Sequence, residues 1–208
     1  MNKRNFAIIG HRAINSGKLQ LNDLAGMGGR MDVLLRAVNS ALFLSHGIRK
    51  DVCIILHLMG GPGPPRRIMF DGVKLRGLHT DERAIAGKVA KVISEPVPPI
   101  GIFSDFGDGI SHSGGDISTT INEWKKNSSK IIRLSADSEP LEKYIESVTQ
   151  EQEISFILSD DADFSPEEYM MMQEIHSCSI GKKWLQGHSA ITIVHHILDQ
   201  KFYSDSDD

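Results

Sequence analysis

The sequence is poor in cysteine and contains no long hydrophobic run. Its two cysteines, Cys53 and Cys178, both lie in apolar stretches, which predicts buried, reduced thiols in place of a disulfide framework. No apolar run approaches the ~18–20 residues that a membrane-spanning helix requires. The apolar residues after position 5 are too few for the core of a secretion signal. We therefore expect a soluble, cytoplasmic protein that does not associate with a membrane.

Aromatic residues and positive charge are also scarce. Aromatic residues form 6% of the chain and the formal net charge is −4, so neither extensive base stacking nor bulk positive charge is expected to hold a nucleic acid. Acidic residues are concentrated at 160–163 and in a tail at 204–208 that we expect to be solvated, whereas basic groups occur near residues 49, 66 and 74. The rest of the surface can therefore carry a modest basic face.

The hydrophobic pattern alternates between strands and helices along most of the chain. A continuous apolar run predicts a buried strand at 52–59, and shorter strands are predicted at 6–9, 131–134, 154–158 and 176–180. Helical spacing and capping signals predict helices at 31–45, 81–93, around Trp124, at 140–148, after the capping box at Ser165, and at 189–202. Strands interleaved with helices predict an α/β fold with a largely parallel sheet. Because neither a repeat nor a linker interrupts the pattern, we expect a single domain over residues 1–208.

Two local signals refine this pattern. Asp71-Gly72, flanked by apolar residues on both sides, predicts the type I′ turn of a β-hairpin. Thr80 is expected to cap the helix that starts at residue 81, where acidic residues suit the positive end of the helix dipole. The glycine-rich segment 104–115 has no pattern that predicts a structure.

Three segments of the chain together match the pattern of a known family. They are Gly-Arg-Met-Asp-Val-Leu-Leu-Arg at 29–36 with its continuation to residue 52, Pro64-Pro65 with Asp-Glu-Arg at 81–83, and Ile-Thr-Ile-Val-His-His-Ile-Leu-Asp at 191–199 with the preceding loop at 179–188. Through them the chain resembles the archaeal tRNA pseudouridine N1-methyltransferases, the TrmY family of the SPOUT class. The resemblance extends over residues 19–201, with a weaker middle at 94–130.

The resemblance implies a SPOUT fold in which residues of about 130–203 are threaded as a trefoil knot. It also implies a homodimer, with S-adenosylmethionine held in the knot and an RNA base arriving near the dimer interface. Two departures mark the chain as a divergent member. Ser159 stands where the family often has glycine, and Ala190 stands where it often has cysteine.

The cofactor contacts that the resemblance implies fall after predicted strands, where ligands bind in open α/β sheets. Backbone groups there can bind an adenine edge while apolar side chains enclose the ring. The residues assigned to S-adenosylmethionine in this way are Leu134, Ser159, Ile180, Gly181, Lys182, Lys183, Trp184, Leu185 and Ala190. The same residues also fit strand ends and a glycine-bounded loop of any α/β protein.

The reaction that the family performs is an in-line displacement in which a ring nitrogen attacks a sulfonium methyl group. Positioning, and stabilisation of charge on the uracil ring, can supply most of the catalysis. The candidate catalytic residues are Arg30 and Arg36, for an RNA phosphate or a base carbonyl, and Asp32, for a hydrogen bond to the ring or acceptance of its proton. The arginines are six residues apart and do not share a helix face well, and Asp32 also fits an ordinary partner of the helix dipole.

Other function classes fit the sequence less well. His188, His195 and His196 are close in sequence, but no carboxylate or cysteine completes a metal-ligand spacing, so we expect no metal site. The stretch Gly-Ile-Ser-His-Ser-Gly at 109–114 has one residue too many for the nucleophile elbow of a serine hydrolase. Two alternatives to tRNA methylation stay open. One is methyl transfer to another RNA, such as a ribosomal uridine or pseudouridine, and the other is an RNA-binding protein that kept the fold without catalysis.

Overall fold

The computed structural model describes residues 3–203, so the expected solvated tail at 204–208 lies outside the described residues. The strands are β1 (Arg4–Ile14), β2 (Phe43–Leu44), β3 (Gly47–Ile48), β4 (Val52–Gly60), β5 (Arg66–Asp71), β6 (Ser104–Gly107), β7 (Ile110–Gly114), β8 (Lys130–Pro140), β9 (Ile154–Ser159) and β10 (His176–Ser179). The helices are α1 (Met31–Leu42), α2 (Glu82–Ser94), α3 (Ile117–Lys126), α4 (Leu141–Ile145), α5 (Pro166–Met171) and α6 (Gly187–Phe202).

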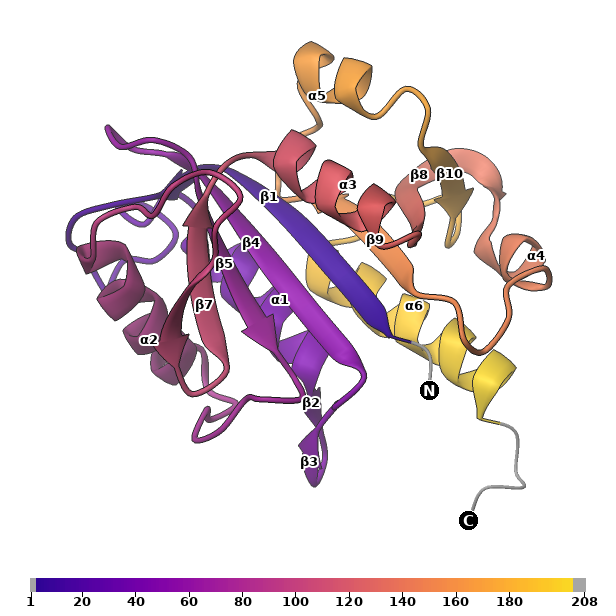
Figure 1. Cartoon of the computed structure of the whole chain (residues 1–208), viewed down its shortest axis with the longest axis horizontal. Helices are drawn as coiled ribbons and strands as arrows, with labels where there is room; N and C mark the ends of the chain where they lie inside the picture. Colours follow the sequence, from indigo (N-terminus) through magenta and orange to yellow (C-terminus); the bar gives the residue numbers. More distant parts are fainter. Residues whose placement is uncertain (1–2, 204–208) are drawn as a thin grey trace.

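Within residues 3–203, eight strands form one sheet in the order β10-β8-β9-β1-β4-β5-β7-β6. The strands from β10 to β4 run parallel to one another. β5, β7 and β6 extend the sheet by antiparallel pairing. Figure 1 shows β1 and β4 side by side in the middle of this sheet. The prediction of an α/β fold with a largely parallel sheet is confirmed.

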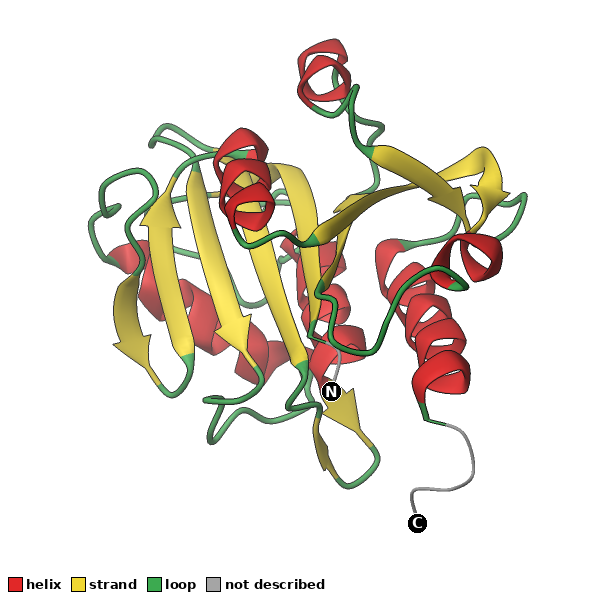
Figure 2. Cartoon of the chain, turned by 45° about the vertical axis from the view of Figure 1, so that its right-hand side comes forward, coloured by secondary structure: helices red, strands yellow, loops and turns green. Residues whose placement is uncertain are grey.

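Helices cover both faces of the sheet, with α1, α2 and α6 on one face and α3 on the other (Figure 1 and Figure 2). Side chains alternate between the faces along β1. Phe6 and Ile8 join the larger core with α1 and α6, whereas Ala7 and Ile9 join a smaller core with α3. Because central strands are buried on both faces, their sequences are largely continuous runs of apolar residues.

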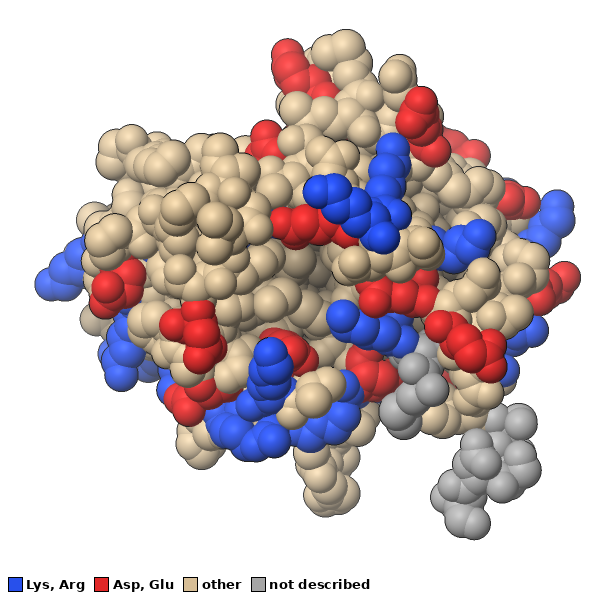
Figure 3. Space-filling view, viewed as in Figure 1, with Lys and Arg blue, Asp and Glu red and all other residues tan. Residues whose placement is uncertain are grey.

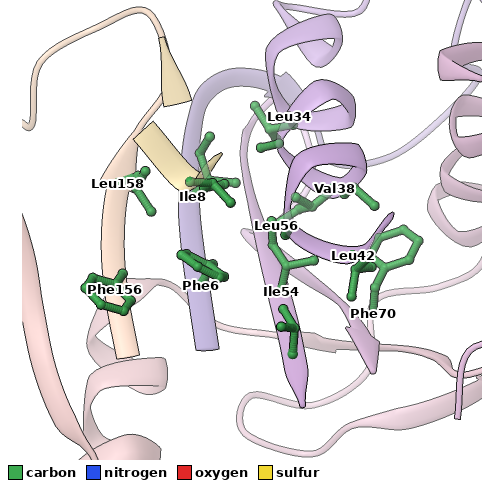
Figure 4. Close-up of a cluster of buried hydrophobic side chains, with 14 of the residues drawn as sticks. Phe6, Ile8, Leu34, Val38, Leu42, Ile54, Leu56, Phe70, Phe156 and Leu158 are labelled. Atoms are coloured by element: carbon green, nitrogen blue, oxygen red, sulfur yellow. The ribbon is translucent and has the colours of Figure 1, made fainter. Parts of the chain in front are cut away.

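Helix α1 packs an apolar stripe onto the sheet. Leu34, Val38 and Leu42 are spaced four residues apart and face β4, the strand that carries Ile54 and Leu56 (Figure 4). The helix ends at Leu42, three residues before the predicted end at 45, because the following residues form the hairpin of β2 and β3. The tight β2–β3 pairing replaces the last predicted turn of the helix.

The hairpin predicted at Asp71-Gly72 is wrong. The Asp71 side chain accepts the backbone N–H of Val73 (3.0 Å), and the Asp71 carbonyl accepts that of Leu75 (2.8 Å). This turn directs the chain away from the sheet, so β5 pairs with β4 and β7 instead. Gly72 allows a close approach of two segments, since a Cβ there would lie 2.1 Å from the Arg49 carbonyl oxygen.

Helix α2 is capped by Asp81 and not by the predicted Thr80. The Asp81 carboxylate accepts the backbone N–H of Ala84 at 2.9 Å. We expect Asp81→Ala to lower the free energy of unfolding by about 1 kcal/mol, because that N–H loses its side-chain acceptor. Thr80→Ala, the matched control, should cost less than about 0.5 kcal/mol. Urea denaturation of the two variants measures both, and an equal loss would contradict the Asp81 cap.

Other local predictions have mixed outcomes. The capping box at Ser165 and Glu168, with proline at the first helical position, is confirmed. Pro140 precedes α4 as its N-cap residue and does not occupy the predicted first helical position. Cys53 and Cys178 are buried free thiols, as predicted. Among the helices described, none is both long enough and apolar enough to cross a membrane.

Candidate cofactor and substrate site

A cavity of about 520 Å³ lies at the carboxyl ends of the parallel strands. Its wall contains residues 134–136 on β8 and residues 158–164 at the end of β9 and after it. Residues 180–187, from the end of β10 to the start of α6, also line it, except for Lys182. Three residues on or next to helices complete the wall: Arg30, Val33 and Ala190. The carboxyl edge of parallel strands is the usual ligand position in open α/β sheets.

The β8 wall is a stretch of strand that has left its hydrogen-bond ladder. Pairing with β9 ends at Arg133, and pairing with β10 is interrupted between Arg133 and Glu139. The backbone of residues 134–138 is therefore outside regular pairing beside the cavity, where Ser179 Oγ donates to the Ala136 carbonyl (3.2 Å). Free backbone donors and acceptors of this kind can bind the polar edge of a planar ring without help from a particular side chain.

The cavity brings together eight of the nine residues that the family resemblance assigns to the cofactor. They come from the middle of β8, from the end of β9, from the loop after β10 and from the start of α6, so only the folded chain assembles them. The eight lining residues are Leu134, Ser159, Ile180, Gly181, Lys183, Trp184, Leu185 and Ala190. Lys182 lies in the same loop but does not line the cavity.

The departure at Ser159 is accommodated within its own loop. The Ser159 hydroxyl donates a hydrogen bond to the Ala162 carbonyl, only three residues away, and so stabilises the turn that follows β9. Trp184 and Leu185 are 69% and 42% exposed. They extend the apolar wall of the cavity out to the molecular surface.

The acidic segment 160–163, which was not among the predicted site residues apart from its neighbour Ser159, belongs to the cavity wall. Asp160, Asp161, Ala162, Asp163 and Phe164 all line it. One signal could have found this segment: it directly follows a buried strand, at the same sheet edge as the predicted cofactor residues.

Arg30 and Arg36 converge on Asp32 despite their separation of six residues. Arg30 is the N-cap residue of α1 and adopts a left-handed conformation (φ 66°), so it is not on the helix surface. Its Nε donates to Asp32 Oδ1 (3.0 Å), and Arg36, one turn along the helix, donates from Nη2 to Asp32 Oδ2. The two guanidinium groups therefore share one carboxylate although the two residues do not share a helix face.

Asp161 connects this arginine pair to the cavity wall. Its Oδ2 accepts from Arg30 Nη1 (2.5 Å) and from Arg12 Nη2 (2.6 Å). Burial alone would raise the pKa of Asp161, but hydrogen bonding and charge from the two arginines lower it below its ordinary value. Asp161 is therefore ionised at neutral pH. Arg12 could not be predicted from the sequence, because its partner carboxylate lies 149 residues away.

The three candidate catalytic residues occupy different positions relative to the cavities. Arg30 lines the large cavity. Arg36 lines a second cavity of about 260 Å³ between α1, the start of α2 and His188. Asp32 is buried, lines neither, and bonds both arginines. The three residues thus form a bridge from one cavity to the other.

The protein surface carries both signs of charge. On the face seen in Figure 3, basic side chains gather mainly at the lower edge and elsewhere lie beside acidic ones. This distribution agrees with the modest basic face expected from the sequence. It favours recognition of RNA by shaped pockets over attraction by bulk charge.

The three C-terminal histidines have separate surroundings. His195 is buried between Arg4 and the Ala41 carbonyl, which its Nε2 contacts at 3.0 Å. Burial, with the nearby charges of Arg49 and Arg4, lowers its pKa to about 3, so it is a neutral packing residue. His188 lines the small cavity, and His196 is exposed. Across residues 3–203, no group of three or more histidine, cysteine or acidic side chains is arranged to hold a metal ion.

Comparison with a solved structure supports the fold. The chain matches the crystal structure of Archaeoglobus fulgidus Nep1 bound to S-adenosylhomocysteine with a TM-score of 0.63, over 96% of this chain and 98% of that one. Sequence identity in that match is 11%, so the likeness extends to the fold alone. The relation confirms the SPOUT-type architecture that the sequence resemblance implied.

Sequence comparisons identify closer relatives. Residues 3–202 match the family model described as "Putative SAM-dependent RNA methyltransferase". The tRNA (pseudouridine(54)-N(1))-methyltransferase of Methanospirillum hungatei is 35% identical over 94% of this chain and 96% of its own length. The enzyme of the same name from Haloarcula marismortui is 36% identical over 94% of this chain and 96% of its own length. The chain belongs to the SAM-dependent RNA methyltransferase family that includes these tRNA pseudouridine N1-methyltransferases.

Proposed function

We propose that this protein transfers a methyl group from S-adenosylmethionine to N1 of pseudouridine in tRNA. The observation that carries the proposal is the 520 Å³ cavity, which gathers eight of the nine expected cofactor residues from distant parts of the chain. The names of the relatives supply the acceptor nucleotide.

The cavity suits an adenosyl cofactor in size and chemistry. Its volume of about 520 Å³ falls in the range of roughly 300–1,000 Å³ that is typical of small-molecule sites. Leu134, Ile180 and Leu185 give it apolar walls, and the unpaired β8 backbone gives it polar atoms at the edge.

When bound, S-adenosylmethionine supplies the methyl group. The side chains of this protein then act on the acceptor base. Arg30, at the rim of the cavity, can stabilise negative charge on the uracil ring as the N1 proton leaves. Asp32 holds Arg30 and Arg36 in a fixed relation, because it accepts from both guanidinium groups. We propose that Asp32 orients these two arginines and that solvent finally accepts the N1 proton.

We further propose that the protein is a cytoplasmic homodimer whose residues 130–203 form a trefoil knot within a single domain. The exposed Trp184, beside the cavity, supplies an apolar surface that a second subunit can cover. The continuous eight-stranded sheet supports one domain, and the free thiols suit a reducing compartment.

The test has two stages. Calorimetric titration with S-adenosylmethionine and S-adenosylhomocysteine should give saturable binding. Methyl transfer should then occur to a tRNA transcript that contains pseudouridine and not to the same transcript with uridine, because only pseudouridine presents a ring nitrogen with a proton at N1. Binding followed by transfer to ribosomal RNA alone would reject the tRNA acceptor. Absence of binding by the folded protein would reject the enzyme and leave an RNA-binding protein.

A further inference from the structure

His11 lies where the central strand β1 leaves its ladders. Pairing of β1 with β9 ends at Ile9 and Ser159, and its pairing with β4 is interrupted after Gly10. At this point hydrogen bonds of Asp160 replace the hydrogen bonds of the strand ladder. The backbone N–H of His11 donates to Asp160 Oδ2 (2.9 Å), and the backbone N–H of Asp160 donates to the Ile9 carbonyl (3.0 Å).

The His11 ring lies between two carboxylates. Its Nδ1 is 2.9 Å from Asp160 Oδ1, and its Nε2 is 3.0 Å from Glu168 Oε2. A neutral ring has one nitrogen without a proton, so only the imidazolium can donate to both oxygens. The hydrogen bonds to Asp160 and Glu168 raise the pKa of His11 to about 10.

Each of these carboxylates also organises the backbone around it. Asp160 Oδ1 accepts the backbone N–H of Ala162 (3.0 Å). Glu168 Oε2 accepts the backbone N–H of Ser165 (2.8 Å) and closes the capping box of α5. The imidazolium therefore joins the two ends of a segment that has neither helix nor strand between Asp160 and Ser165.

We propose that His11 is a positioning residue for the cofactor cavity, because it fixes the segment 159–164 as one wall of that cavity. Six consecutive residues of this segment line the cavity, although His11 itself does not. The proposal rests on the proposed function, since it assigns the wall to the cofactor. It also links the wall to the substrate side, because Asp161 lies next to Asp160 and bonds Arg30.

The other charged groups around this segment have partners of their own. Asp161 is paired with Arg12 and Arg30. Asp163 accepts from the hydroxyl of Tyr169 (2.9 Å). Among these described pairs, His11 makes the contact that joins β1 to both the β9 loop and α5. Loss of its charge should therefore loosen the wall and leave the rest of the sheet intact.

The test compares two variants of His11 with a matched control. His11→Gln keeps a polar side chain and removes the charge, and His11→Phe removes both hydrogen bonds. His176→Gln is the control, because His176 Nε2 also bonds a carboxylate, Glu139 Oε1 (3.0 Å), but lines no part of the cavity. We expect the affinity for S-adenosylhomocysteine to fall by about tenfold or more in both His11 variants, since the ligand must then order the wall itself.

Kinetic measurements should separate the His11 variants from the His176→Gln control in the same way. KM for S-adenosylmethionine should rise in the His11 variants while kcat changes much less, and the control should match the wild type in both. Unchanged affinity in both His11 variants, when the wild type binds, would overturn the positioning role and leave the proposed function intact. If the wild type itself fails to bind, the proposed function fails first.

Ring protonation gives a readout that does not depend on activity. The ¹⁵N shifts of both His11 ring nitrogens should report protonation at a mildly alkaline pH, above the ordinary histidine pKa of 6.5. Because the folded pKa is raised, the charged contact is complete below the ordinary value of 6.5 and is lost as the pH rises through about 10. A neutral His11 ring at mildly alkaline pH would overturn the proposal even if His11→Phe fails to fold.

Discussion

Leu185→Arg is expected to abolish saturable binding of S-adenosylhomocysteine while the protein remains folded. Leu185 lines the cavity and is 42% exposed, so the longer side chain has room to leave the apolar core undisturbed. Within the cavity it replaces an apolar wall with a cation that a bound ligand would desolvate. We expect affinity to fall by at least about 100-fold, which corresponds to about 2.8 kcal/mol.

Leu185→Met is the matched control for this variant. Methionine has nearly the volume of leucine and stays apolar, so the cost in affinity should be small. Thermal unfolding of both variants should be close to that of the wild type, because neither change touches a fully buried side chain. If Leu185→Arg binds the ligand as tightly as Leu185→Met does, the cofactor does not occupy this cavity.

The sequence predicted those parts of the fold that are encoded by local burial. The strand at 52–59 coincides with β4 (Val52–Gly60) because both of its faces are buried. The strand at 6–9 was predicted to end at Gly10, but β1 continues to Ile14. Gly10 allows α1 to pack closely against the strand, since a Cβ at this position would lie 2.7 Å from Leu34 Cδ2. A contact with a helix 24 residues further along cannot be inferred from strand propensity.

The segment 104–115 illustrates a second limit. It forms the hairpin of β6 and β7, whose turn has positive φ at Gly107, Asp108 and Gly109. Glycine and aspartate tolerate that conformation, but the segment lacks a clear apolar alternation. β7 owes its place to pairing with β5, some 40 residues earlier in the chain.

The residues that line the large cavity were predicted where the family resemblance supplied them and were missed where long-range pairing brings them together. The loop 180–185 and Ala190 were carried over from the family, and except for Lys182 they line the cavity. His11 is bonded to Asp160, a residue 149 positions away. Neither residue has a neighbour in sequence that suggests the pair. The acidic run was therefore not predicted as part of the site, although His11 and Arg12 hold it in the cavity wall.

Asp32→Asn is expected to lower kcat for methyl transfer by about 100-fold, the scale seen when one preorganised electrostatic contact is removed. The change keeps the shape of the side chain but removes the negative charge that Arg30 and Arg36 share. The two guanidinium groups then repel each other and lose their fixed relation to the acceptor base. Affinity for S-adenosylhomocysteine should change little, since Asp32 does not line the large cavity.

Stability measurements separate this role from a simple interaction with the helix dipole. Asp32 lies in the first turn of α1, where a carboxylate stabilises a helix by about 0.3–1 kcal/mol. Glu82→Gln is the control, because the Glu82 carboxylate is 3.7 Å from Arg36 Nε and touches the same network more weakly. A small loss of stability in Asp32→Asn with wild-type kcat would reduce Asp32 to a dipole partner. A large loss of kcat that Glu82→Gln does not share would identify Asp32 as the group that aligns both arginines for catalysis.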